Sequence, residues 1–215
     1  MNLPNKITLT RIFMIPVFVV VFFLTAIPYN YFIAGIIFVV AACTDFIDGH
    51  IARKYNLVTN LGKFLDPIAD KVLVSTALIC MLVKPELLQV MWQGEWVMTV
   101  CSICTAVILA RELIVSGFRM VAASSGLVLA ADKVGKVKTT FQDISIAMLL
   151  IGADFFGLLG VSKVLNVIGL ICLAAAAVLT IWSGAGYIIK NRQVLRVPAE
   201  EKDEENKGEK NSEDS

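Results

Sequence analysis

Residues 31–70 read YFIAGIIFVVAACTDFIDGHIARKYNLVTNLGKFLDPIAD. The stretch opens with a long apolar run and continues into a polar segment that carries four aspartates. In lipid, such a run must satisfy its backbone hydrogen bonds within itself, and a helix does so. A membrane span needs about 20 mostly apolar residues. The stretch therefore predicts a membrane helix that ends in a group of carboxylates.

The rest of the chain repeats the apolar pattern. Of the 215 residues, 57% are hydrophobic and 17% are charged, whereas a soluble domain carries about 45–50% apolar and about 25% charged residues. We therefore expect an all-α membrane protein with about six transmembrane helices and one membrane domain, residues 1–197. The six candidate spans are 7–26, 31–52, 66–83, 95–118, 135–153 and 163–189.

Charge is distributed unevenly along the chain. Residues 198–215 hold eight acidic residues and three lysines without apolar periodicity, which predicts a disordered acidic tail. Lysines and arginines collect on one side of the predicted spans, and basic loops face the cytoplasm. We expect a multi-pass protein with both termini and the segments 53–70 and 111–138 in the cytoplasm. No nucleic acid partner is expected.

The four aspartates of the opening stretch have helical spacing. Asp45 and Asp48 are three residues apart and Asp66 and Asp70 four apart, so each pair projects from one helix face. Carboxylates at this depth are costly unless they meet water, cations or each other. Oxygen ligands without His or Cys suit Mg²⁺, Mn²⁺ or Ca²⁺. Four carboxylates suffice for two divalent ions, an arrangement that polarises phosphoryl groups.

Small residues lie between the acids. Gly49, Ala52 and Gly62 remove side-chain bulk, so that a nucleotide or another backbone can approach. Arg53 follows near the same helix face and could hold a phosphate. Close helix packing is the alternative explanation for Gly49 and Ala52.

Together these positions form one pattern, Asp45-x2-Asp48-Gly49-x2-Ala52-Arg53-x8-Gly62-x3-Asp66-x3-Asp70. The pattern resembles the signature of the CDP-alcohol phosphatidyltransferases, and all eight positions match with the spacing intact. The resemblance implies transfer of a phosphatidyl group from CDP-diacylglycerol to an alcohol, with CMP leaving. It also implies a homodimer in a bacterial plasma membrane, with a polar cavity facing the cytoplasm.

The resemblance further implies a role for each residue of the pattern. Asp45, Asp48 and Asp66 would bind metal, two Mg²⁺ or Mn²⁺ ions in all. Asp70 would complete the metal cluster and act as the base on the acceptor hydroxyl. The CDP-lipid site would be lined by Gly49, Ala52, Arg53 and Gly62, with Asn5 and Thr8 as further candidates beside Arg11.

The acceptor is indicated by a second basic segment. Arg111, Arg119, Lys136 and Lys138 could hold an acceptor phosphate, although anchoring at an anionic membrane surface explains single members equally well. Three segments resemble the branch of the family that uses glycerol 3-phosphate: Pro4-Asn5-x2-Thr8-x2-Arg11, Arg111-Glu112 and Gly135-Lys136-x-Lys138-Thr139.

Alternative functions stay open on sequence grounds. The same chemistry could serve inositol phosphate, serine or phosphatidylglycerol. An ion-coupled membrane transporter is the alternative from another class, since intramembrane acids also form ion pathways. Transporters often carry internal repeats, and the aspartate pattern occurs once in this sequence.

Overall fold

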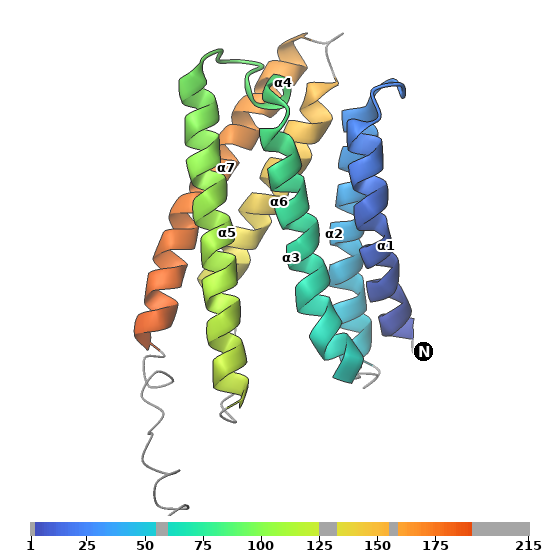
Figure 1. The fold of residues 1–215 in the computed structure, drawn as a ribbon, viewed down its shortest axis with the longest axis vertical. Coiled ribbons are helices and arrows are strands. Elements are labelled where there is room, and N and C mark those ends of the chain that lie inside the picture. Colours follow the sequence, from blue (N-terminus) through green and yellow to red (C-terminus); the bar gives the residue numbers. More distant parts are fainter. Residues whose placement is uncertain (1–2, 55–59, 125–132, 155–158, 191–215) are drawn as a thin grey trace, which may run out of the picture.

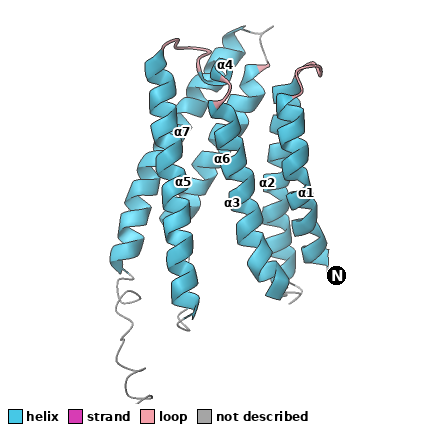
Figure 2. Cartoon of the chain, in the orientation of Figure 1, coloured by secondary structure: helices cyan, strands magenta, loops and turns pink. Residues whose placement is uncertain are grey.

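The computed structural model describes residues 3–54, 60–124, 133–154 and 159–190. That part of the chain is helical and contains no strand (Figure 2), which confirms the predicted all-α class. Each of the six predicted spans overlaps one long helix, and a short helix, α4, was not predicted. The helices are α1 Leu3–Phe23, α2 Asn30–Lys54, α3 Asn60–Leu82, α4 Pro85–Leu88, α5 Glu95–Ser124, α6 Lys133–Ala153 and α7 Leu159–Lys190.

The long helices run alternately up and down, which gives the bundle two distinct ends (Figure 1). At the end drawn lowest, which we call the lower end, α1, α3 and α6 begin and α2, α5 and α7 finish. Helix α4 lies at the opposite, upper end. The end of α2 and the start of α3, which carry the four aspartates, therefore meet at the lower end.

The interior combines aromatic contacts with very close helix packing. Phe18 and Phe22 of α1 are fully buried, and the ring of Phe22 lies 5.3 Å from that of Tyr31 in α2. The most extensive contact joins α6 and α7. A Cβ on Gly169 would come within 2.6 Å of Leu149, so this glycine permits the close approach of the two helices.

The surface of the bundle is rich in large apolar side chains, and the largely apolar interior also holds polar ones. Trp182 and Leu113 are 76% and 75% exposed, while Ser145, Asn166 and Thr180 are buried. Ser145 and Asn166 donate hydrogen bonds to backbone carbonyls of other helices. Apolar side chains outside and bonded polar groups inside are what a lipid environment requires.

Two helical stretches are long and apolar enough to cross a membrane, by length and composition. They are Glu95–Met120 in α5 and Gly160–Tyr187 in α7. Shorter apolar stretches lie in α1, α2 and α3. Their length and composition are consistent with a membrane protein.

Candidate active site

The four predicted metal ligands lie on two adjoining helices at the lower end (Figure 1). Asp45 and Asp48 fall in the last three turns of α2, and Asp66 and Asp70 in the first three turns of α3. The backbone therefore brings both pairs toward the same end of the bundle. The four side chains lie outside the described part of the structure, so the metal cluster stays a prediction.

The predicted CDP-lipid residues occupy the same end. Asn5 and Thr8 lie in the first two turns of α1, and α1 contacts both α2 and α3. Their side chains also lie outside the described residues, as do those of the remaining candidates. Arg11, one turn beyond Thr8, is fully buried. The remaining candidates are Gly49, Ala52 and Arg53 in α2 and Gly62 in α3.

Two of the predicted acceptor-site cations meet at a single carboxylate. Oε1 of Glu112 accepts a hydrogen bond from Lys138 Nζ at 2.6 Å and another from Arg111 Nη1 at 3.0 Å. Lys138 reaches this carboxylate from α6 and is 2% exposed. A buried charge requires such a partner, because an unpaired one pays a large desolvation cost.

A third cation joins from the helix that carries the predicted base. Lys71, the residue after Asp70, donates a hydrogen bond to the hydroxyl of Ser116. Ser116 in turn donates to the backbone carbonyl of Glu112. We call Lys71, Arg111, Glu112 and Lys138 the Glu112 cluster; it ties α3, α5 and α6 together in the lower half of the bundle.

Arg111 is held from a fourth helix as well. Its Nη2 donates to the hydroxyl of Ser183 in α7 at 3.1 Å. A Cβ on the next residue, Gly184, would lie 3.0 Å from Arg111 Cγ and 3.6 Å from its Nε. Gly184 thus leaves the space through which the arginine side chain passes.

The other two predicted acceptor-site residues do not join the cluster. Arg119 lies eight residues beyond Arg111 in α5, about 12 Å along the helix axis. Its Nε donates to the Tyr187 hydroxyl at 3.1 Å, and its guanidinium carbon lies 5.2 Å from the centre of that ring. The side chain of Lys136 is exposed at the start of α6.

A narrow crevice opens beside the Glu112 cluster. It offers about 20 Å³ of space, enough for one water-sized group. Gln142 lies in its wall, is 3% exposed, and its Oε1 is buried without a hydrogen-bond partner. We call this space the Gln142 crevice; its lining is Lys71, Val74, Ser75, Leu109, Glu112, Lys138, Thr139 and Gln142.

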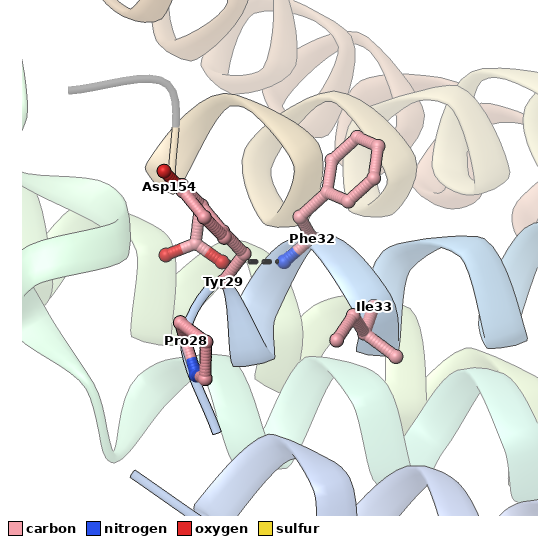
Figure 3. Close-up of a pocket in the computed structure, with 5 residues that line it drawn as sticks. All are labelled: Pro28, Tyr29, Phe32, Ile33 and Asp154. Atoms are coloured by element: carbon pink, nitrogen blue, oxygen red, sulfur yellow. Dashed lines mark hydrogen bonds between the residues drawn. The ribbon is translucent and has the colours of Figure 1, made fainter. Parts of the chain in front are cut away.

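A larger pocket, of about 280 Å³, lies at the upper end and is almost entirely apolar (Figure 3). Its one acid, Asp154, accepts a hydrogen bond from the backbone N–H of Phe32 at 2.6 Å. This carboxylate therefore caps the first turn of α2. The pocket is lined by Pro28, Tyr29, Phe32, Ile33 and Asp154.

Several residues of the Glu112 cluster and of the Gln142 crevice were not predicted from the sequence. Glu112 entered the sequence analysis only through its resemblance to a family pattern, although its position beside Arg111 in a basic segment could have indicated a shared ion pair. Lys71 could have been found as a cation directly after the predicted base. No local pattern points to Gln142 or Ser183, because both join the site through contacts between distant helices. Among the described residues, no group of three or more His, Cys, Asp and Glu side chains could hold a metal.

The pattern that defines the CDP-alcohol phosphatidyltransferase family matches residues 1–182. A Bacillus subtilis (strain 168) protein named CDP-diacylglycerol--glycerol-3-phosphate 3-phosphatidyltransferase is 39% identical over 206 residues, 91% of this chain and 97% of its own. Proteins of the same name from Rickettsia bellii (strain RML369-C) and Shigella flexneri serotype 5b (strain 8401) are 39% and 38% identical. They cover 86% and 90% of this chain, and 93% and 97% of their own length.

Proposed function

The chain belongs to the CDP-alcohol phosphatidyltransferase family, and from that membership we propose that it makes phosphatidylglycerophosphate. It is an enzyme that transfers the phosphatidyl group of CDP-diacylglycerol to glycerol 3-phosphate and releases CMP. The reaction is a step of phospholipid biosynthesis. Relatives that match almost end to end carry the name of this activity.

The identity of the acceptor is inferred from the charge of the Glu112 cluster. Arg111 and Lys138 both pair with the one carboxylate of Glu112, so these three side chains carry one more positive than negative charge. A phosphate monoester carries a charge of about −1.5 to −2 near pH 7, so it is attracted to this positively charged group. Serine and phosphatidylglycerol carry no phosphate monoester, so the positive charge of this group does not favour either of them as the acceptor.

The metal fits the donor set at the lower end. Asp45, Asp48, Asp66 and Asp70 supply oxygen ligands from the adjoining ends of α2 and α3, and such ligands suit Mg²⁺ or Mn²⁺. The family is generally dependent on divalent metal; two ions are our proposal for this chain. When bound, the ions neutralise the diphosphate and the developing charge on CMP.

The chain's own residues then position the reactants and move one proton. Asp70 accepts the proton of the acceptor hydroxyl as that oxygen attacks the phosphorus that carries the diacylglycerol. A new P–O bond forms, the P–O bond to CMP breaks, and CMP leaves with the electron pair. The cytidine and diphosphate lie against α1 and α2, held by Arg53, Asn5 and Thr8 where Gly49, Ala52 and Gly62 leave space.

The topology follows from the same arrangement. We place six spans across a bacterial plasma membrane, with the lower end, both termini and the acidic tail 198–215 in the cytoplasm. The lower end carries most of the basic residues of the described helices, as cytoplasmic ends do. Trp92 and Trp96 lie at the upper end, where aromatic side chains mark a membrane interface. A homodimer is part of the proposal, on the family's precedent.

An acceptor panel tests this function. Purified protein in nanodiscs receives CDP-diacylglycerol, Mg²⁺ and one radiolabelled acceptor at a time: glycerol 3-phosphate, inositol phosphate, serine or phosphatidylglycerol. We expect label from glycerol 3-phosphate in the lipid fraction, with one CMP released per label. Incorporation of serine or phosphatidylglycerol in its place would contradict the proposal. A preference for inositol phosphate would keep the phosphate site and change the acceptor.

A further inference from the structure

Gln142 is a buried polar side chain in the wall of the crevice beside the Glu112 cluster. It is 3% exposed, and its Oε1 has no hydrogen-bond partner. Leaving an acceptor buried and unbonded is costly, and folded proteins rarely do so without a reason. The oxygen is therefore available to a donor that arrives from outside the fold.

The space beside this oxygen has the size of one hydroxyl group. The Gln142 crevice offers about 20 Å³, room for one water-sized group and too little for a whole acceptor molecule. Its walls include Glu112 and Lys138 of the Glu112 cluster. A substrate held by that cluster can insert one oxygen here and no more.

The spacing along α6 fits a small phosphorylated alcohol. Lys138 and Gln142 are four residues apart on one face of α6, so their Cβ atoms lie about 5–6 Å apart. In glycerol 3-phosphate, only a few covalent bonds separate the phosphorus from the hydroxyl of the middle carbon. One molecule can thus meet both side chains while its terminal hydroxyl points elsewhere to react.

We propose that Gln142 accepts a hydrogen bond from the non-reacting, middle hydroxyl of the acceptor, and that this contact selects glycerol 3-phosphate over phosphorylated alcohols without that hydroxyl. The inference rests on the proposed function, whose acceptor it makes specific. A site built to bond a substrate hydroxyl rejects an analogue that lacks it, because the buried protein group is then left unpaired.

The test pairs two acceptors with three forms of the full chain in nanodiscs. The acceptors are glycerol 3-phosphate and 3-hydroxypropyl phosphate, which has the phosphate and the terminal hydroxyl but no middle one. The variant is Gln142→Met, which keeps the length of the side chain and removes its acceptor. The matched control is Thr140→Val on the exposed face of α6, where the threonine hydroxyl donates only to the Lys136 carbonyl.

The wild type should use glycerol 3-phosphate at least about 10-fold better in kcat/KM. Gln142→Met should lower kcat/KM for glycerol 3-phosphate by about 10-fold or more and leave that for 3-hydroxypropyl phosphate within about two-fold. The selectivity should therefore collapse in this variant and survive in Thr140→Val.

Three results would overturn the inference. A wild type that does not distinguish the acceptors removes its basis, whatever the variant does. Equal losses on both acceptors would show that Gln142 only supports the fold, or that the crevice holds nothing but water. Use of neither acceptor by a wild type that still releases CMP with another alcohol would instead remove the proposed function, and the inference with it.

Discussion

At the upper end of the bundle, polar side chains join one helix to the next; in the lower half, charged side chains from different helices gather around one carboxylate. The upper end joins Tyr31 to Glu86 at 2.8 Å and Asn166 to the Leu87 carbonyl at 2.8 Å. In the lower half, the single carboxylate of Glu112 forms ion pairs with both Arg111 and Lys138.

Polar groups therefore have a structural role at the upper end and a functional role in the Glu112 cluster. Leu87 and Leu88 of α4 are buried against the bundle, so the hydrogen bonds of the upper end hold a closing element in place. The Glu112 cluster instead gathers two cations on one carboxylate inside the bundle, and charged groups gathered in this way mark candidate functional sites. Matched substitutions at the two ends should therefore differ in effect.

The largest effect should follow from removing the carboxylates of the lower end. Asp70→Asn removes the proton acceptor and should lower kcat by about 10²–10⁴-fold. Asp45→Asn, Asp48→Asn and Asp66→Asn should weaken metal binding, and a higher Mg²⁺ concentration should restore part of their activity by mass action. The measurement is a metal titration of turnover for the four variants.

Asp154→Asn is the control at the upper end. An amide oxygen can still accept the N–H of Phe32, so turnover should stay within about two-fold of wild type. Recovery of Asp70→Asn with metal to the level of the other three would remove its role as base and leave it a fourth ligand.

A smaller loss should follow from removing one cation. Lys138→Met keeps the buried stem and deletes the charge, so the KM for glycerol 3-phosphate should rise by about 10- to 150-fold, the cost of one charge-assisted hydrogen bond. The KM for CDP-diacylglycerol should stay unchanged. Lys84→Met, which removes an upper-end cation 3.7 Å from Glu86, should change neither. A rise confined to the KM for CDP-diacylglycerol would show that the Glu112 cluster binds the CDP-lipid and not the acceptor.

The smallest effect should come from crowding Arg111 without touching it chemically. In Gly184→Ala the new Cβ would meet Arg111 Cγ at 3.0 Å and push the guanidinium from its place, so the KM for glycerol 3-phosphate should rise by about two- to ten-fold. Gly186→Ala, two residues on in α7, meets nothing within 4 Å and gains the same helix propensity. Equal kinetics for both variants would show that Arg111 does not need this position.

Much of the fold could be predicted from hydropathy because the long helices coincide with apolar runs. The largest error at a helix start concerns α3, which begins at Asn60 rather than residue 66. Lys63 ended the apolar run in the sequence, yet a helix needs only backbone bonds to continue through a charged turn. Helix α4 was missed because its four residues form no periodic pattern. Its position depends on Asn166, far along the chain.

The candidate site likewise has a part that could be predicted from the sequence and a part that could not. The aspartate pattern is local, so its spacing alone predicted two pairs on adjoining helices. The acceptor residues were chosen by charge alone, and the structure separates them into Arg111 and Lys138, which share Glu112, and Arg119, which stacks on Tyr187. Which cation finds which partner depends on packing between helices, and one sequence carries no direct record of that.

The most direct test of the account applies one substitution, Glu to Gln, at both ends. Glu112→Gln leaves Arg111 and Lys138 without their shared charge, and each loses a charge-assisted hydrogen bond. The catalytic efficiency with glycerol 3-phosphate should fall by at least about 10-fold at an unchanged CDP-diacylglycerol KM. Glu86→Gln keeps an oxygen for the Tyr31 hydroxyl and should stay within about two-fold of wild type. Equal losses in the two variants, or a larger loss for Glu86→Gln, would contradict the assignment of the chemistry to the lower end.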